Sequence, residues 1–462
     1  MENSLIVLIL AAGESKRMKS NHSKVCMKVA GKPMIDWVLN TSLSLEPKSI
    51  GVVLGHKMEE VKKTIKEFPV ETFVQKKLLG TADAVKSAKS LLERFQDGDV
   101  LILYGDVPLI SKDTLMNLIT KHLEENNSVT ILSAQVDDPE GYGRIIRDKQ
   151  GKFLRIVEEA DTTEKEKTIT ETNSGIYVFK VKKLLKALTE IKNDNAQGEY
   201  YLTDVVSLIK GKMGILEIFD PYEVIGINTR AQLAKANEYV RGRINEEFMH
   251  NGVEIIDPKN TYIDVDVKIG KDTVIYPMTF ITSDTVVGKE CSIGPNTLID
   301  RCKISDNVQI RYSVCESAII SEGVSVGPFS HLRPGADLRK DVKIGNFVEV
   351  KKSVLSEGTK AGHLSYLGDS TVGKKVNVGA GTITCNYDGI RKNKTFIGDN
   401  AFIGSNTALV APVSIGRGSL IGAGSVITKD VPENTLALGR ARQINKVGWV
   451  KHENKEEEQN DR

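Results

Sequence analysis

The sequence has few of the features that mark secreted, membrane-bound or nucleic-acid-binding proteins. Only 5 of its 462 residues are Cys and no two form a C-x-x-C pair, so neither a disulfide framework nor a zinc site is expected. Basic and acidic side chains almost balance at 63 to 61, which predicts no nucleic acid and no membrane surface as a partner. The apolar run at 5–10 is far shorter than the ~20 residues of a membrane span. The chain start also lacks the positive region of a signal peptide, and we expect a cytoplasmic protein.

The first half of the chain alternates strand-like and helix-like segments. We expect strands at 5–10, 49–54, 99–103 and 128–136, and helices at 33–45, 80–95 and 111–125. This alternation predicts an α/β, Rossmann-like domain with a mostly parallel sheet, in which ligands bind beyond the carboxyl ends of the strands. Gly13 and Asp106 each follow a predicted strand and should lie at that edge.

Glycine recurs at regular spacing in the second half. Between residues 255 and 427 an aliphatic residue followed by Gly appears at multiples of six, as in Ile293-Gly294, Ile344-Gly345 and Ile403-Gly404. Such hexads predict a left-handed parallel β-helix of roughly ten coils, with the aliphatic residues inside and the small residues at tight corners. The polar segment 386–394 should protrude as a loop, and the repeat should end after Asp430.

A helical pattern separates the two halves. At 229–249 the apolar residues fall on one helical face: Leu233, Ala236, Val240, Ile244 and Phe248. We therefore divide the chain into a first domain at 1–228, a connecting helix at 229–250, a β-helix domain at 251–443 and a polar tail at 444–462 that we expect to be disordered.

Small and basic residues follow the first predicted strand. A turn of small residues at 10–13 lets backbone N–H groups approach phosphate oxygens, and Arg17 and Lys24 could balance the charge of a triphosphate and of leaving pyrophosphate. Solvated basic residues on an ordinary turn are the alternative. Asp106 and Asn228 offer oxygen ligands of the kind that Mg²⁺ prefers, although either could instead cap a helix.

Over essentially its full length, the chain resembles the bacterial bifunctional family that combines N-acetylglucosamine-1-phosphate uridyltransferase and glucosamine-1-phosphate N-acetyltransferase activities. The first domain would then be a sugar-phosphate nucleotidyltransferase with Arg17 and Lys24 in catalysis, and Asp106 and Asn228 would bind Mg²⁺. The resemblance implies that UTP and the UDP-sugar are bound by Leu10, Ala11, Ala12, Gly13, Lys24, Gln75, Gly80, Thr81, Tyr104, Gly105, Asp106, Gly143, Glu158, Asn173 and Asn228.

The first domain departs from the family pattern in four places. The usual second Gly and Thr after Gly13 are replaced within Glu14-Ser15-Lys16, and His22-Ser23 stands where Leu-Pro is common. The usual Gly-His after Thr81 is Ala82-Asp83, and Asn173-Ser174-Gly175 replaces Asn-Thr-Gly. The positions that match the metal and sugar contacts are kept.

The β-helix holds a second set of matching residues. Acetyl transfer to an amine needs a base, and the imidazole of His363 is suited to that role, although a lone His is more often structural. The resemblance implies His363 as the base, and Glu349 could orient it. It implies that the sugar phosphate is bound by Arg333, Lys351, Tyr366 and Asn377. It implies that acetyl-CoA is bound by Ala380, Asn386, Tyr387, Ser405, Ala423 and Arg440. It also implies a homotrimer.

The predicted function is a two-step synthesis of UDP-N-acetylglucosamine: acetylation of glucosamine 1-phosphate by acetyl-CoA, then coupling of the product to UTP. One alternative is a single-activity nucleotidyltransferase of the ADP-glucose or GDP-mannose type whose β-helix only regulates or assembles. Another is a non-enzymatic assembly subunit built on the same two folds. Enzymes of the first kind lack the set His363, Asn386-Tyr387 and Arg440, which argues against that alternative. A subunit of the second kind need not keep Asp106, Lys24 and Asn228 together.

Overall fold

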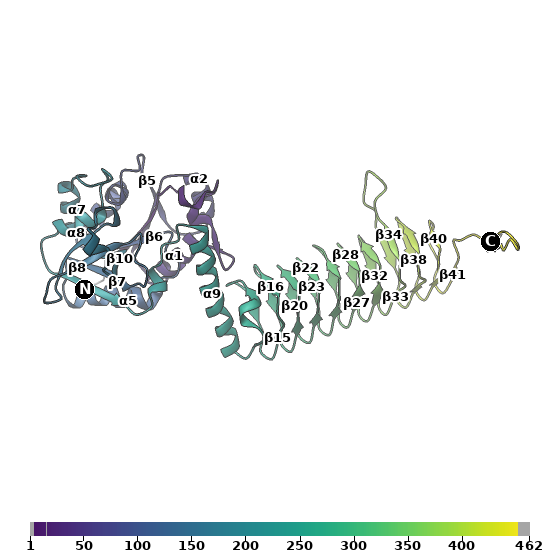
Figure 1. The fold of residues 1–462 in the computed structure, drawn as a ribbon. Coiled ribbons are helices and arrows are strands. Elements are labelled where there is room, and N and C mark those ends of the chain that lie inside the picture. Colours follow the sequence, from purple (N-terminus) through teal and green to yellow (C-terminus); the bar gives the residue numbers. More distant parts are fainter. Residues whose placement is uncertain (1–3, 15, 451–462) are drawn as a thin grey trace, which may run out of the picture. The chain divides into compact units, whose positions relative to one another are not determined.

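The computed structural model describes residues 4–14 and 16–450, which form two compact units (Figure 1). The first unit runs to Ile244 and includes Ile263–Val265, and the second contains Asn245–Tyr262 and the chain from Asp266 onward. Within residues 4–14 and 16–450, we find no helix with the length and apolarity that crossing a membrane requires.

The division falls within α9 (Arg230–His250), which lies within one residue of the expected helix at each end. Ala236, Val240 and Ile244 are buried, as the helical spacing of the apolar residues predicts. Asn245 is also buried, and its amide donates to the carbonyls of Pro258 and Thr261 at 2.8 and 3.1 Å.

The sheet of the first unit is mostly parallel, as predicted. Its main strands, in sheet order, are β11 (Met213–Ile218), β7 (Val129–Gln135), β10 (Glu171–Lys180), β6 (Asp99–Tyr104), β1 (Leu5–Ala11), β4 (Ser49–Leu54) and β5 (Glu71–Val74). Only β10 runs antiparallel to its neighbours in this order, and the hairpin β8 (Gly143–Arg147) and β9 (Phe153–Val157) pairs with its beginning.

Helices cover both faces of this sheet (Figure 1). They are α1 (Met34–Leu43), α2 (Met58–Thr64), α3 (Thr81–Ser87), α4 (Lys89–Arg94), α5 (Lys112–Glu124), α6 (Glu164–Lys167), α7 (Val181–Glu190) and α8 (Leu202–Leu208). Alternate residues of β1 enter two apolar cores, with Ile6 and Leu8 on one face and Val7 and Ile9 on the other. The six buried residues after Leu5 thus reflect a strand covered on both sides.

Two helix predictions need correction. The expected helix at 80–95 is two helices, because the backbone leaves the helical conformation at Ala88 between α3 and α4. Pro33 was expected inside the first turn of α1, but it is the cap residue, with an extended backbone.

The second unit is a parallel β-helix built from three sheets of 11, 10 and 9 strands. It begins at β12 (Glu254–Ile255) and ends at β41 (Leu436–Ala437), so the repeat continues for one strand beyond the Asp430 end that the sequence predicted. β41 pairs in parallel with β39 (Leu420–Ile421), which extends the regular stacking. The loop at 386–394 protrudes beside β34 (Ile383–Cys385), as expected (Figure 1).

The aliphatic residues of the hexads fill the interior, as predicted. Ile293, Ile344 and Ile403 are at most 2% exposed. The glycines that follow them serve mainly close stacking: a Cβ at Gly345 would lie 2.0 Å from the carbonyl oxygen of Gly362 in the next coil. Positive φ occurs at some of these glycines, such as Gly294, and also at corner residues such as Phe329 and Phe347.

The polar tail was expected from residue 444. Residues 441–450 contain no helix or strand and are exposed, and residues 451–462 lie outside the described part of the chain.

We expect the interior of the β-helix to dominate the stability of the second unit. Leu355 is fully buried in β29 (Val354–Leu355), and Leu355→Ala should destabilise the unit by about 2–5 kcal/mol through lost burial and the cavity it leaves. Leu298→Ala, at an outward position that is 37% exposed, is the matched control and should cost much less. Equal melting-temperature shifts for the two variants would contradict this assignment of the interior.

Candidate active sites

A cleft of about 660 Å³ opens at the carboxyl ends of β1 and β6. These strands pair in parallel, with Leu10 opposite Tyr104, so the turn after β1 and the segment after β6 are neighbours. The cleft brings together these residues singled out from the sequence: Leu10, Ala11, Ala12, Gly13, Arg17, Lys24, Gln75, Gly80, Thr81, Tyr104, Asp106, Gly143, Glu158, Asn173 and Asn228. Gly105 lies behind the cleft wall, and its N–H donates to the carbonyl of Leu10 at 3.0 Å.

Lys24, Asp106 and Asn228 meet in this cleft. The Lys24 ammonium contacts Asp106 Oδ2 and donates to Asn228 Oδ1 at 2.8 Å, so oxygen atoms from residues far apart in the sequence converge on one cationic group. Both side chains of the Lys24–Asp106 pair are largely shielded from solvent, at 15% and 11% exposure. A carboxylate and an amide carbonyl directed at one cation are a donor set that also suits Mg²⁺.

The structure excludes the helix-cap alternative for both oxygen donors. Ser111, and not Asp106, caps α5 by accepting from the Thr114 N–H at 3.1 Å. Thr229, and not Asn228, accepts from the Gln232 N–H at 3.2 Å at the start of α9.

The side of the cleft that Gly80 and Thr81 line is held by the segment before α8. Tyr200 donates its N–H to Leu79 and accepts from the N–H of Ala82, while the Leu202 N–H donates to Thr81 Oγ1 at 2.9 Å. Gly80 lies against this segment with φ +112°, and a Cβ there would come within 2.5 Å of the Tyr200 carbonyl oxygen. Glycine is therefore required at position 80 by both conformation and space.

Another side of the cleft is lined by Glu158. Thr203 Oγ1 donates to Glu158 Oε1 at 2.8 Å, and Glu158 Oε2 would lie 3.5 Å from a Cβ built on Gly143. Burial is the main reason that the pKa of Glu158 is raised, with repulsion from Asp204 and Asp161 adding to it and the Thr203 bond opposing it. Thr203 could not be singled out from the sequence, because Glu158, the residue to which it donates, is 45 positions away.

Tyr104 and Asn173 complete that side. Burial raises the pKa of Tyr104 far above its usual range, so its hydroxyl remains protonated. Asn173 donates to the hydroxyl of buried Tyr177 at 2.7 Å, which fixes its side chain. Gly175 lies close to the Tyr104 ring, where a Cβ would come within 2.8 Å.

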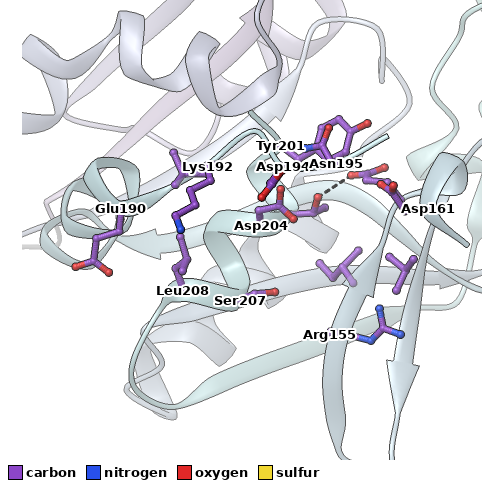
Figure 2. Close-up of a pocket in the computed structure, with 15 residues that line it drawn as sticks. Arg155, Asp161, Glu190, Lys192, Asp194, Asn195, Tyr201, Asp204, Ser207 and Leu208 are labelled. Carbon is purple, nitrogen blue, oxygen red and sulfur yellow. Dashed lines mark hydrogen bonds between the residues drawn. The ribbon is translucent and has the colours of Figure 1, made fainter. Parts of the chain in front are cut away.

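A second cavity of about 530 Å³ adjoins the cleft behind Glu158 and Thr203. Figure 2 shows Asp161, Asn195 and Asp204 gathered at one end of this cavity. Burial raises the pKa of Asp204, and the Asn195 side chain opposes that shift by a hydrogen bond.

The departures from the family pattern at 14–16 and 82–83 make contacts in or beside the cleft. Lys16 lines the cleft and pairs with Glu14 at 2.7 Å, while Ser15 lies outside the described residues. Asp83 accepts a hydrogen bond from the Gln75 amide at 2.9 Å.

The second unit gathers its candidate residues on adjacent coils. Glu349 and Lys351 lie on β28 (Glu349–Lys351), which pairs on one side with β25 (His331–Leu332), just before Arg333. On the other side it pairs with β31 (Tyr366–Gly368), with Glu349 opposite Tyr366. Parallel register thus places these side chains on one face.

Positive charge is concentrated there. Arg333 pairs with Glu349 at 2.8 Å, which raises the pKa of the guanidinium. Contact with Lys392, from the protruding loop, lowers the pKa of Lys351, and Arg333 adds to the repulsion. Lys392 was not predicted, since only the fold of the 386–394 loop brings it to Lys351. Glu349 contacts Arg333, and its role in orienting His363 stays a prediction.

His363 ends β30 (Lys360–His363) at the adjoining corner, where its side chain is exposed. Asn377 begins β33 (Asn377–Val378) on the next coil. The corner position that His363 occupies recurs two residues after each buried, paired strand residue. In the three following coils it is filled by Ala380, Ser405 and Ala423. These small side chains leave one continuous strip along the corner.

Arg440 and the loop lie along this strip. Arg440 donates to the carbonyl of Ala423 at 2.6 Å, at the end of the strip farthest from His363. Asn386 donates to Asp369 at 2.5 Å and lies 3.4 Å from the Tyr366 hydroxyl, which ties the loop base to the cationic face. Tyr387 is exposed at 60% and is braced by an antiparallel bridge to Lys392.

Comparison with known proteins identifies both units. Residues 6–215 match the nucleotidyl transferase family model, and residues 394–429 match the bacterial transferase hexapeptide model. A protein from Thermotoga petrophila named bifunctional protein GlmU is 55% identical over 450 residues, covering 97% of this chain and 99% of its own. GlmU proteins from Thermoanaerobacter pseudethanolicus and Geotalea uraniireducens are 52% and 49% identical, covering 96% and 97% of this chain and 97% and 99% of their own. The chain therefore belongs to the bifunctional GlmU family, and it is an acetyltransferase and uridyltransferase of UDP-N-acetylglucosamine synthesis.

Proposed function

We propose that uridyl transfer occurs in the cleft of the first unit, with Mg²⁺ bound by Asp106 and Asn228. The observation that carries this assignment is the convergence of both side-chain oxygens on the Lys24 ammonium beside the turn after β1. Two protein ligands suit Mg²⁺, which keeps waters and phosphate oxygens in its other positions. When bound, the metal would neutralise phosphate charge and orient the triphosphate.

Different residues of the cleft bind the phosphates, the leaving group and the sugar. Backbone N–H groups of the turn at 10–13 approach the phosphates, and Arg17 and Lys24 stabilise the charge that develops on leaving pyrophosphate. Glu158 and Asn173 hold the sugar hydroxyls, each fixed by its own hydrogen-bond partner. The phosphate of N-acetylglucosamine 1-phosphate is then placed to attack the α-phosphorus of UTP.

Acetyl transfer occurs on the second unit. Arg333, Lys351 and Lys392 form a cationic site that suits the dianionic phosphate of glucosamine 1-phosphate. Acetyl-CoA lies along the strip of small residues that ends at Arg440, with its thioester toward His363. His363 takes the proton that the substrate amine loses as it attacks the thioester carbonyl. The C–S bond of the thioester then breaks, and the CoA sulfur takes up that proton and leaves as the thiol.

An exposed apolar corner beside His363 supports a homotrimer. Tyr312, Phe329, Phe347 and Leu364 occupy successive coils and are 41–61% exposed. Phe329 and Phe347 stack with ring centroids 5.5 Å apart. A continuous exposed apolar ladder favours burial against another subunit, which would also enclose His363.

The two units each hold one site, and we assign the division between the activities to α9. Because UTP and acetyl-CoA are intracellular metabolites and the five cysteines are free thiols, we also place the enzyme in the cytoplasm.

Asp106→Asn should abolish most uridyl transfer and leave acetyl transfer unchanged. The substitution keeps the size of the side chain but removes the only anionic ligand of the proposed metal pair. Pyrophosphate release from UTP at several Mg²⁺ concentrations measures the effect, and Asp113→Asn, on the exposed start of α5, is the control. Full activity of Asp106→Asn at limiting Mg²⁺ would remove Asp106 from the metal site.

His363→Ala should lower the kcat of acetyl transfer by about 10²–10⁴ and change KM little, because the cationic site binds the phosphate. The defect should shrink as pH rises, since more substrate amine is then already deprotonated. Lys351→Ala should instead raise KM for glucosamine 1-phosphate. His331→Ala, which breaks a 2.8 Å contact with Glu316 on the same face, is the control. CoA release by the parent and by His363→Ala at equal rates at neutral pH would make His363 structural.

Phe347→Asp should dissociate the trimer and reduce acetyl transfer while uridyl transfer persists. The charge would be buried without a partner in the proposed interface. Phe396→Asp is the control, because Phe396 is similarly exposed but lies on a different sheet of the β-helix. Light scattering gives the oligomer mass, and an unchanged trimer in Phe347→Asp would place the interface elsewhere.

A further inference from the structure

The Gln75 side chain is held in one orientation on the side of the cleft that Gly80 and Thr81 line. Gln75 follows β5 and is only 6% exposed, and its backbone N–H donates to Leu54 at 2.8 Å. Its side-chain Nε2 donates to the Gly80 carbonyl at 3.0 Å and to Asp83 Oδ2 at 2.9 Å. A carbonyl and a carboxylate can only accept hydrogen bonds, so the NH₂ group must face them and the carbonyl Oε1 must face away.

Asp83 contacts the Gln75 amide but does not line the cleft. It lies in the first turn of α3, and its neighbours Thr81 and Ala84 line the cleft whereas Asp83 itself does not. It is also a position at which the chain departs from the family pattern, which usually has His there. Its side chain therefore acts on the nucleotide only through Gln75.

We propose that Asp83 is a positioning residue that selects uracil over cytosine by fixing the Gln75 amide. This inference rests on the proposed uridyltransferase site and places the uracil ring of UTP against Gln75, which lines the cleft with Gly80 and Thr81. Uracil presents the N3–H donor, which the outward Oε1 accepts. Cytosine presents an N3 lone pair, which Oε1 repels. A flipped Gln75 would suit cytosine, but its Oε1 would then face both Gly80 and Asp83, two acceptors.

The test is the ratio of kcat/KM for UTP to that for CTP. Asp83→Asn should lower this ratio by about 10-fold, the worth of one hydrogen bond to a charged group, because the introduced amide can donate to a flipped Gln75. Asp83→Ala should lower it in the same direction, since one of the two acceptors that oppose the flip is removed. The ratio does not depend on the fraction of enzyme that is folded. Where CTP turnover is too slow, the ratio of the dissociation constants for CTP and UTP tests the same discrimination at the level of binding.

Glu93→Gln is the matched control, since Glu93 is an exposed carboxylate on neighbouring α4 and should leave the ratio unchanged. A parent enzyme that transfers uridyl groups and an Asp83→Asn variant with an unchanged ratio would overturn the proposal, as would equal losses with both nucleotides. A parent without uridyl transfer would instead overturn the proposed function itself.

Discussion

In both units, parallel strands pair in register, and this pairing decides which side chains become neighbours. In the β-helix it carries each position onto the same face one coil later, so Glu349 lies opposite Tyr366 and Arg333 comes beside both. In the first unit it brings the ends of β1 and β6 to one edge, where the turn at 10–13 and Asp106 line the same cleft. Both sites depend on this pairing, because neither is formed by residues adjacent in sequence.

Much of the fold could be predicted because its signals are local. Aliphatic-glycine hexads report one short strand and one turn each, and β1 shows its burial as an unbroken apolar run. The two features that the sequence did not predict, the division of the 80–95 helix and the last coil, depend on packing instead. The break at Ala88 has no Gly or Pro to mark it, and the last coil, ending at β41, lacks the regular hexad after Asp430.

The sequence predicts the residues that line the candidate sites better than the side chains that hold those residues in place. The cleft residues could be named because they resemble a family pattern, and the structure collects nearly all of them. Side chains that act on those residues could not be named. Thr203 reaches Glu158 across 45 positions, and Lys392 reaches Lys351 only through the shape of the protruding loop. Contacts of this kind follow from tertiary packing, which leaves no periodic trace in the sequence.

The two sites handle charge in opposite ways. In the cleft, Lys24 already balances Asp106, so a metal ion at the proposed site would have to displace an internal ammonium, which would free Lys24 to approach the phosphates of a bound nucleotide. On the β-helix, Lys351 and Lys392 face each other with Arg333 nearby, and their mutual repulsion lowers the pKa of Lys351. If this face is the proposed binding site for glucosamine 1-phosphate, an arriving phosphate dianion would relieve that repulsion as it binds, which would add to its direct attraction. The repulsion in the free site would then favour the doubly charged substrate over a neutral amino sugar, before any contact with the sugar ring is made.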